Sequence, residues 1–343
     1  MSGQGVPGTA SVDEPELAVP LEEALTAHFQ RPCRIVALRR QPYVYSTSFL
    51  LEELDVRLQD GTRLHLLFKH LTRAGMLEGA RTFKPAFLYD PLREIETYRS
   101  ILLGEALGSP VCYGVLAGAG RYGLLLEKVS GRELYCVGDT AVWCEVARWL
   151  ADMHDRFTGR VEELRRTHGR LLQYDAAFYR RWLDRAQASV GSTAGAEGRG
   201  PALDQVVAAL QAALERLATT PTTFLHGELY ASNILVAEEA TRRRVCAVDW
   251  EMAGLGPGLL DVAALSSGWD DANRRAIAAA YWAALQHNPG WPPEEDEFMT
   301  LLDSASLCVA VQWLGWSPGW SPPPEHDRDW LGEAVLLAER LRP

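Results

Sequence analysis

Two segments in the second half of the chain carry most of its information: residues 224–236 read FLHGELYASNILV, and residues 245–251 read VCAVDWE. Each contains a short apolar run of the kind that forms a buried strand. Glu228 and Asn233 lie five positions apart in the first segment, and Asp249 follows the apolar run of the second. The pattern therefore presents two acids and an amide at strand ends.

These side chains are the types that phosphoryl transfer requires. The reaction needs a carboxylate near the attacking hydroxyl, oxygen ligands for Mg²⁺ and a cation on the nucleotide phosphates. In kinase catalytic loops the acid and the metal-binding amide are also five positions apart, which lets the loop turn back and direct both at the transferred phosphate. We therefore expect Glu228, Asn233 and Asp249 to be catalytic, with Asn233 and Asp249 as the metal ligands.

A cation and its partner occur earlier in the chain. Lys69 stands late in the apolar run HLLFK, where an ammonium is costly unless an anion accompanies it. Glu94, on the predicted helix that follows, can be that anion. Such a Lys–Glu pair directs the ammonium at nucleotide phosphates in kinase-type sites.

Together these motifs resemble the aminoglycoside phosphotransferase and choline kinase superfamily. The family signature is a His-Gly-Asp loop, an asparagine five residues after its aspartate, and an Ile/Val-Asp-Trp-Glu strand end. The matching segments are 226–228, Asn233 and 248–251, and the resemblance extends to Gly254 and to the Asp-Val-Ala segment at 261–263. It covers roughly residues 34 to 320.

The resemblance implies roles for further residues. Asp261 would brace the catalytic loop, and His226 would bond loop backbone rather than act as a base. Residues 126–131 look like the hinge whose backbone groups bind the adenine edge, with Glu127 and Val129 as the contacts. Ser46 and Ser48, in the segment YVYSTS at 43–48, would lie in a hairpin over the phosphates, since the chain has no GxGxxG or Walker A motif.

One position departs from the family pattern. Residue 228 is Glu where the family has Asp, which adds one methylene and moves the carboxylate by about one C–C bond length. A glutamate still accepts protons with a reference pKa of about 4.3, close to that of Asp. We therefore expect activity with an altered reach.

Composition restricts the class of protein. With 343 residues there is room for roughly two domains of about 150 residues each. The net charge of −11 argues against nucleic-acid and membrane-surface partners, and permits a cationic substrate. No apolar run approaches the roughly 20 residues of a membrane helix, the longest being 305–316. The N-terminus lacks a secretory signal, so we expect a cytoplasmic protein.

The six cysteines form no CxxC motif or His/Cys cluster, so they indicate neither a zinc site nor a disulfide framework. We interpret them as reduced thiols in the core. They are Cys33, Cys112, Cys136, Cys144, Cys246 and Cys308.

The order of patterns predicts a kinase-like α+β fold with two lobes. A tail over 1–18 without apolar periodicity precedes a helix over 21–29. Residues 34–70 read as antiparallel strands with an Asp-Gly turn at 60–61, a helix opens at Pro91 and is expected to face that sheet, and strands follow at 111–115 and 122–128. We therefore assign 19–130 to an N-terminal nucleotide-binding lobe of antiparallel sheet with one helix.

Beyond Gly131 the pattern is mostly helical. Helices are predicted over 142–156, 176–188 and 203–217, with a flexible-looking segment at 191–200. We assign 131–343 to a larger, mainly α-helical C-terminal lobe for catalysis and substrate binding.

Each feature also has an ordinary structural explanation. Lys69 could snorkel from an edge strand, Glu94 could be solvated, and Asp249 could cap the next turn. The tryptophans of 313–320 could form an aromatic wall for a sugar ring or a cation, but core packing is favoured. The acids of 294–297 could attract an amine, but at a helix start they usually favour the helix dipole.

Three functions were weighed. The leading one is a Mg²⁺-dependent O-phosphotransferase that uses ATP or GTP on a small hydroxylated molecule: an antibiotic, an amino sugar, an amino alcohol or a biosynthetic intermediate. The second is a catalytically silent kinase-like protein that binds a nucleotide or a metabolite. A protein kinase is set aside because only eleven residues separate Asp249 from Asp261, too few for a peptide-docking segment. A monomer and a homodimer both remain open.

Overall fold

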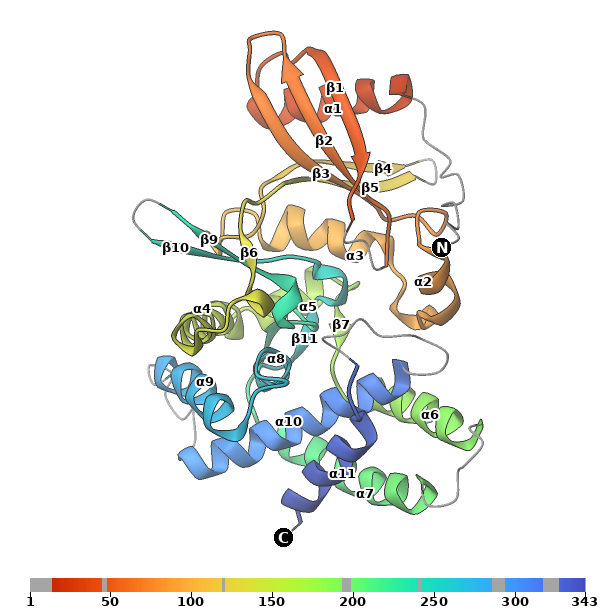
Figure 1. Cartoon of the computed structure of the whole chain (residues 1–343), viewed down its shortest axis with the longest axis vertical. Helices are drawn as coiled ribbons and strands as arrows, with labels where there is room; N and C mark the ends of the chain where they lie inside the picture. Colours follow the sequence, from red (N-terminus) through yellow and green to blue (C-terminus); the bar gives the residue numbers. More distant parts are fainter. Residues whose placement is uncertain are drawn as a thin grey trace, which may run out of the picture. The chain divides into compact units, whose positions relative to one another are not determined.

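The structure, a computed structural model, describes residues 14–44, 48–118, 121–192, 199–239, 242–285, 294–316 and 327–342. It divides into two compact units, which Figure 1 shows. The first comprises Met1–Arg81 with Pro110–Lys128, and the second comprises Thr82–Ser109 with Val129–Pro343. Each unit is described by itself.

The first unit is an antiparallel five-stranded sheet in the order β1-β2-β3-β5-β4. The Asp60-Gly61 turn joins β2 to β3, with Gly61 at a φ of +89° that suits glycine. The expected strands are therefore confirmed. Their bounds are β1 Ile35–Pro42, β2 Leu51–Leu58, β3 Arg63–His70, β4 Cys112–Gly118 and β5 Arg121–Glu127.

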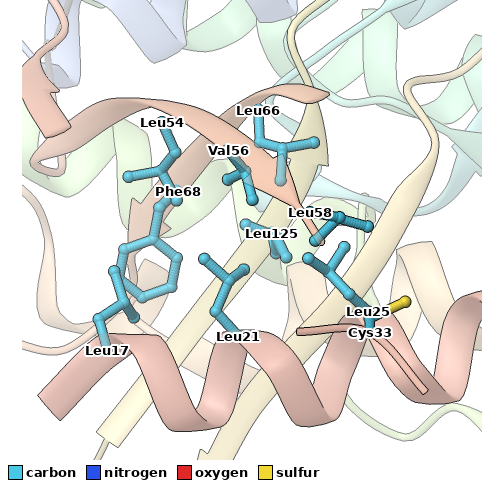
Figure 2. Close-up of a cluster of buried hydrophobic side chains, with 10 residues drawn as sticks. All are labelled: Leu17, Leu21, Leu25, Cys33, Leu54, Val56, Leu58, Leu66, Phe68 and Leu125. Atoms are coloured by element: carbon cyan, nitrogen blue, oxygen red, sulfur yellow. The ribbon is translucent and has the colours of Figure 1, made fainter. Parts of the chain in front are cut away.

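Helix α1, Glu14–Phe29, covers one face of this sheet. It begins inside the segment expected to be a tail up to residue 18, and it continues through Pro20. Figure 2 shows Leu17, Leu21 and Leu25 on one side of α1, pointing at the sheet side chains. Burial of three leucines at about 1.5–3 kcal/mol each outweighs the roughly 3 kcal/mol that an interior proline costs.

Ion pairs run across the first three strands. Arg40, Glu52 and His70 form a half-buried group, with Arg40 Nη2 2.8 Å and His70 Nε2 2.6 Å from Glu52 Oε2. Burial opposes ionisation of Glu52, but the hydrogen bonds from His70 and Arg40 outweigh it and hold the pKa of its carboxyl below its usual value. The charged form of Glu52 therefore stabilises the first unit.

The second unit is mainly helical, as expected. Three predicted helices are confirmed as α4 Thr140–Thr158, α6 Ala176–Ser192 and α7 Arg199–Leu217. Figure 1 shows the long helix α10, Glu295–Trp316, lying beside α6 and α11. The other α-helices described in this unit are α3 Pro91–Glu96, α5 Val161–Thr167, α8 Leu259–Leu265, α9 Asp271–Ala284 and α11 Trp330–Arg340, whereas α2, Glu78–Phe83, lies mostly in the first unit.

Two small sheets in the second unit hold the central motifs. One has the order β10-β9-β6 and the other β7-β11-β8. The bounds of their strands are β6 Arg132–Glu133, β7 Leu172–Gln173, β8 Thr222–Leu225, β9 Ile234–Glu238, β10 Arg243–Ala247 and β11 Gly254–Pro257.

The segment around α3 differs from the expectation. It was assigned to the sheet lobe, but residues 82–109 group with the second unit. Arg93 explains this, because its guanidinium donates to three backbone carbonyls of that unit: Leu88 O at 3.0 Å, Glu251 O at 2.8 Å and Arg170 O at 2.8 Å. The other boundary lies between Lys128 and Val129, inside the expected hinge segment.

Helix α10 is long and apolar enough to cross a membrane by length and composition alone. However, 78% of its most apolar window is buried inside the protein, so it is a core helix. Trp313 contributes to this core, 6% exposed and stacked on Trp330 with ring centroids 5.3 Å apart. Core packing of Trp313 is thus confirmed, and residues 317–326 lie outside the described part.

The cysteines are free, as expected, but not all of them are in the core. Cys33, Cys246 and Cys308 are buried, whereas Cys136 is exposed. The interpretation as core thiols is therefore wrong for Cys136.

Candidate functional site

The loop after β8 carries the predicted acid and is built around a glycine. Gly227 has a φ of +86°, and a Cβ there would lie 2.0 Å from the hydroxyl oxygen of Tyr174 and 2.3 Å from Met252 O. Both the backbone conformation and the space therefore require glycine. The loop turns sharply at 227 and places Glu228, which is half-buried, just beyond the strand.

Asp261, in the first turn of α8, holds this loop. Its carboxylate is fully buried and accepts two backbone hydrogen bonds, from His226 N to Oδ2 at 2.8 Å and from Gly227 N to Oδ1 at 2.9 Å. Hydrogen bonds to an ionised acceptor are shorter and stronger than neutral ones. The carboxylate thus fixes two consecutive peptide units directly before Glu228.

The His226 side chain is a second brace. Its Nε2 lies 2.8 Å from Val248 O, and its Nδ1 accepts from Glu228 N at 3.3 Å. Because Val248 O can only accept and Nδ1 must accept, the ring is neutral with its proton on Nε2. The imidazole therefore ties the loop to the strand end that precedes Asp249, and its two nitrogens are occupied by backbone.

Asn233 closes the loop from the other side. Its Nδ2 donates to Glu228 O at 2.9 Å, and Glu228 O also accepts from Tyr230 N at 2.7 Å. Val248 N donates to Asn233 O at 2.9 Å, which brings the two central motifs side by side. Since the amide nitrogen of Asn233 binds the loop, its amide oxygen is directed away from that contact.

Asp249 follows Val248, beyond the end of β10, in a left-handed conformation, with φ 63° and ψ 64°. It stands at the N-terminal position of the short 3-10 helix Trp250–Met252, but its side chain makes no capping bond there. The ordinary explanation, a helix cap, therefore does not apply. A non-glycine residue held in this region costs free energy and is characteristic of functional sites.

The turn after Asp249 is held from several sides. Trp250 stacks on Phe224 with centroids 5.6 Å apart and an interplanar angle of 7°. The Tyr174 hydroxyl donates to Met252 O at 2.7 Å. Glu251, which is 5% exposed, is paired with Lys84, whose side chain is also buried. These contacts hold the backbone of residues 250–252, directly after Asp249, in place.

A buried pair on α4 and α9 extends the brace. His154 Nδ1 lies 2.7 Å from the Tyr281 hydroxyl, and its Nε2 lies 3.4 Å from Asp261 Oδ2. His154 is 2% exposed and Tyr281 is 3% exposed. Gly258 leaves room for them, since a Cβ there would lie 2.7 Å from His154 Nδ1. The pair therefore supports the carboxylate that holds the loop.

Two buried tyrosines, Tyr174 and Tyr230, belong to the surroundings of the loop. Burial raises the pKa of Tyr174 and of Tyr230 well above the usual value, and the negative charge of Glu228 raises both further. Both groups therefore remain neutral, and Tyr174 remains a hydrogen-bond donor to Met252 O.

The first unit contains Lys69, Ser48 and Glu127. Lys69 is 4% exposed on β3, in register with Leu51 and Leu124, and its ammonium lies 5.9 Å from the Phe49 ring centroid. Ser48 O accepts from Leu77 N at 3.1 Å. Glu127 ends β5 and accepts from Val111 N at 3.1 Å. The predicted contact at Ser46 lies outside the described residues.

Two other predicted nucleotide contacts belong to the second unit. Glu94 is 1% exposed on α3, next to the Arg93 anchor, so it is not a solvated helix residue. Val129 opens the second unit, and its carbonyl accepts from Gly131 N at 3.1 Å. Lys69 and Glu94 thus belong to different units, and their pairing stays a prediction.

The donor set of the second unit suits Mg²⁺. No group of three or more His, Cys, Asp and Glu side chains that could hold a metal occurs in the described ranges. Mg²⁺ does not need one, because it usually keeps several waters and takes one or two carboxylates plus phosphate oxygens. The Asn233 amide oxygen and the Asp249 carboxylate, which does not cap the turn after it, are hard oxygen donors of that kind.

A sequence model of the phosphotransferase enzyme family matches residues 92–296, more than half of the chain. The chain belongs to the phosphotransferase enzyme family. The predicted superfamily and the predicted enzyme class are thereby confirmed. No curated protein matches the chain in sequence.

Solved structures of other phosphotransferases share the fold of this family member. A microcompartment-associated aminopropanol kinase aligns with a TM-score of 0.58 at 15% identity, over 88% of this chain and 92% of the other. An ethanolamine kinase from Plasmodium vivax gives 0.59 at 11% identity, over 96% and 89%. The GDP complex of wild-type aminoglycoside 2'-phosphotransferase-IIIa gives 0.55 at 11% identity, over 94% and 97%. The kinase-like two-lobed fold is therefore confirmed.

Several residues that support the candidate site are not apparent from the sequence. Lys84, Arg93, His154, Tyr174 and Tyr281 all support the loop or the Asp249 turn. Arg93 stood in the sequence directly before Glu94, and a cation beside an expected buried acid was a usable signal. The other four act through long-range contacts that no local spacing reveals.

Proposed function

We propose that this phosphotransferase transfers the γ-phosphate of ATP or GTP to a hydroxyl group of a small molecule, with Mg²⁺ bound at Asn233 and Asp249. The observation that carries the proposal is the Asp261 carboxylate, which holds the amides of His226 and Gly227 at 2.8 and 2.9 Å. This brace costs a buried charge, and its result is a rigid peptide directly before Glu228.

Each residue has a distinct part in the proposed reaction. Glu228 accepts a hydrogen bond from the acceptor hydroxyl and orients the oxygen towards the γ-phosphate. It takes the hydroxyl proton as the new P–O bond forms and the bond from the γ-phosphorus to the bridging oxygen of the β-phosphate breaks, which releases ADP or GDP. Asn233 and Asp249 hold the Mg²⁺, which, when bound, neutralises charge on the phosphate oxygens. Lys69 binds the nucleotide phosphates, and Glu94 is its anionic partner. Glu127 and Val129 offer backbone groups to the base, and Ser46 and Ser48 contact the phosphates.

The acceptor is a small molecule with a hydroxyl group. Related structures include kinases of aminopropanol and ethanolamine, and the net charge of −11 would attract a cationic alcohol of that kind. The acceptor classes in the proposal are an amino alcohol, an amino sugar, an antibiotic and a biosynthetic intermediate. A flexible glutamate at 228 suits an acceptor hydroxyl that lies about one C–C bond length farther from the loop.

The test is a screen for phosphate transfer from ATP and from GTP to a library of hydroxylated metabolites and antibiotics. Asp249→Ala serves as the blank, since it removes the carboxylate proposed as a metal ligand. With an acceptor in hand, Glu228→Ala should lower kcat by about 10²–10⁴, the usual contribution of a positioned acid or base. Unchanged turnover in Glu228→Ala would remove Glu228 from the mechanism.

A catalytically silent protein is the second candidate, and the glutamate at 228 is the feature that favours it. Glu228→Asp separates the two, because it restores the family's shorter carboxylate. If the wild type binds nucleotide but transfers no phosphate to any acceptor, and Glu228→Asp gains transfer, the native protein is the silent form.

A further inference from the structure

A cavity of about 720 Å³ lies within the second unit, away from the residues assigned to phosphate transfer. It is open to solvent on one side and is lined by α6, α7, the first turn of α8 and the strands β7 and β11. Its walls are mostly apolar and include Leu183, Leu210, Leu214 and Leu255. Pockets that hold small molecules are usually about 300–1,000 Å³ and are lined mainly by apolar side chains.

The cavity is at the base of the α6–α7 hairpin, where both helices are described. Its lining comes from the first residues of α6, up to Leu183, and from α7 beyond Val207. Ser192, at the end of α6, is about 14 Å from Leu183 along the helix, at about 1.5 Å per residue. None of the residues assigned to catalysis or to nucleotide binding lines the cavity.

Tyr174 connects the cavity to the catalytic loop. Its side chain lines the cavity, and its hydroxyl donates to Met252 O at 2.7 Å. Three glycines leave room for the Tyr174 side chain. A Cβ at Gly256 would lie 2.6 Å from Tyr174 Cβ, and a Cβ at Gly254 would lie 2.6 Å from Tyr174 Cε2. A Cβ at Gly227 would lie 2.0 Å from the Tyr174 hydroxyl oxygen. The ring thus connects the cavity wall to the loop before Glu228.

The charged side chains that line the cavity are two acids and two arginines, and one of the arginines is placed to pair with an anionic ligand. Among its acids, Asp175 accepts from Phe178 N at 2.9 Å and Glu215 accepts from Gln211 Nε2 at 3.3 Å. Arg165 is paired with Glu162. Arg180 is exposed at the cavity and makes no hydrogen bond or ion pair with the described residues. A carboxylate or sulfonate on an apolar ligand would therefore meet Arg180 with little competition.

We propose that this cavity is a second small-molecule site, for an apolar compound with a single anionic group, and that its occupancy stiffens the catalytic loop through Tyr174. The apolar body lies among the leucines, and the anion pairs with Arg180. A ligand against the Tyr174 ring restricts the movement of Tyr174, so the peptide at Gly227 and the carbonyl of Met252 also move less.

The binding half of the proposal is tested with 8-anilinonaphthalene-1-sulfonate, an aromatic anion whose fluorescence rises in apolar surroundings. The wild type should bind one equivalent saturably. Arg180→Ala should raise the dissociation constant about tenfold, because the charged contact is lost. Arg181→Ala, the neighbouring arginine on α6 that does not line the cavity, is the matched control and should bind as the wild type does.

A second variant separates the cavity from nonspecific dye binding. Ala218 is exposed in the cavity wall, so Ala218→Trp fills the space without overpacking the core, and Ala218→Ser leaves it open. Binding should be lost in Ala218→Trp and kept in Ala218→Ser. Equal binding in both variants, or in Arg180→Ala and the wild type, would overturn the site.

The coupling half is measured by hydrogen exchange of the amides at 226–228, with and without the saturating anion. Exchange should slow at least about threefold in the wild type and should not change in Tyr174→Phe, which keeps the ring and loses the bond to Met252 O. An equal effect in both proteins would overturn the role of Tyr174. Neither readout needs nucleotide or turnover, so failure here is distinct from failure of the proposed phosphotransfer.

Discussion

Replacement of Asp261 by Asn is the sharpest structural perturbation of the loop. The carboxylate accepts two backbone bonds at 2.8 and 2.9 Å in a fully buried place. An amide of the same volume keeps one acceptor oxygen and turns an NH₂ group towards the other N–H. One charged hydrogen bond, of about 1.5–3 kcal/mol, is lost and the other becomes a neutral bond of about 0.5–1.5 kcal/mol. We expect a loss of about 2–4 kcal/mol in the free energy of unfolding.

The assay is urea unfolding followed by tryptophan fluorescence and circular dichroism. Asp271→Asn is the matched control. Its carboxylate is exposed and has Arg340 as its only ion-pair partner among the described residues, so the change should alter stability by less than about 1 kcal/mol. In the phosphotransfer assay, Asp261→Asn should reduce kcat more than it raises the KM for nucleotide, since it disorders the loop rather than the nucleotide contacts. A loss of stability no larger than that of the control would refute the reasoning.

Three further predictions concern other parts of the molecule. Glu52→Gln should reduce the fall of the melting temperature in acid. Because the pKa of Glu52 is lowered in the folded protein, its stabilisation is complete above the ordinary pKa of about 4.5 and is lost as the pH falls below that value. The same slope in the variant as in the wild type would contradict this. Lys84→Met should cost about 3–5 kcal/mol by leaving Glu251 buried without its partner, and adding Glu251→Gln should recover much of it; the urea midpoints of the single and double variants decide. Gly227→Ala should impair folding or turnover, because the new methyl group meets the Tyr174 hydroxyl at 2.0 Å, and normal yield and activity would show that the loop adapts.

Local patterns predicted the strands of the first unit and three helices of the second because both depend on nearby residues. The alternation of 51–58 and 63–70 and the Asp-Gly turn between them determined β2 and β3. Helix α1 is longer than predicted, because residues up to 18 show no apolar periodicity and read as a tail. The leucine at position 17, which docks the first turns on the sheet, belongs to a contact that the sequence alone does not display.

The central motifs are also recognisable from the sequence, because the spacing of Glu228 and Asn233 and the strand end before Asp249 predict where their side chains lie in the fold. What the sequence could not give is the support behind them. Arg93 groups α3 with the second unit by donating to carbonyls 77 and 158 positions away. Tyr174 reaches Met252 from 78 positions away. Such contacts follow from the packing of the whole unit and leave no local periodicity.

The most direct test of the account is Mg²⁺-dependent nucleotide binding, measured by isothermal titration calorimetry with ATP and with GTP. The wild type should bind at least one of them in the presence of Mg²⁺ and more weakly with EDTA, and Asp249→Ala should lose the difference between the two conditions. Asp271→Ala, an exposed aspartate of the same unit, should behave as the wild type does. Equal binding by Asp249→Ala and the wild type under both conditions would contradict the assignment of Asp249 as the metal ligand and, with it, the proposed reaction.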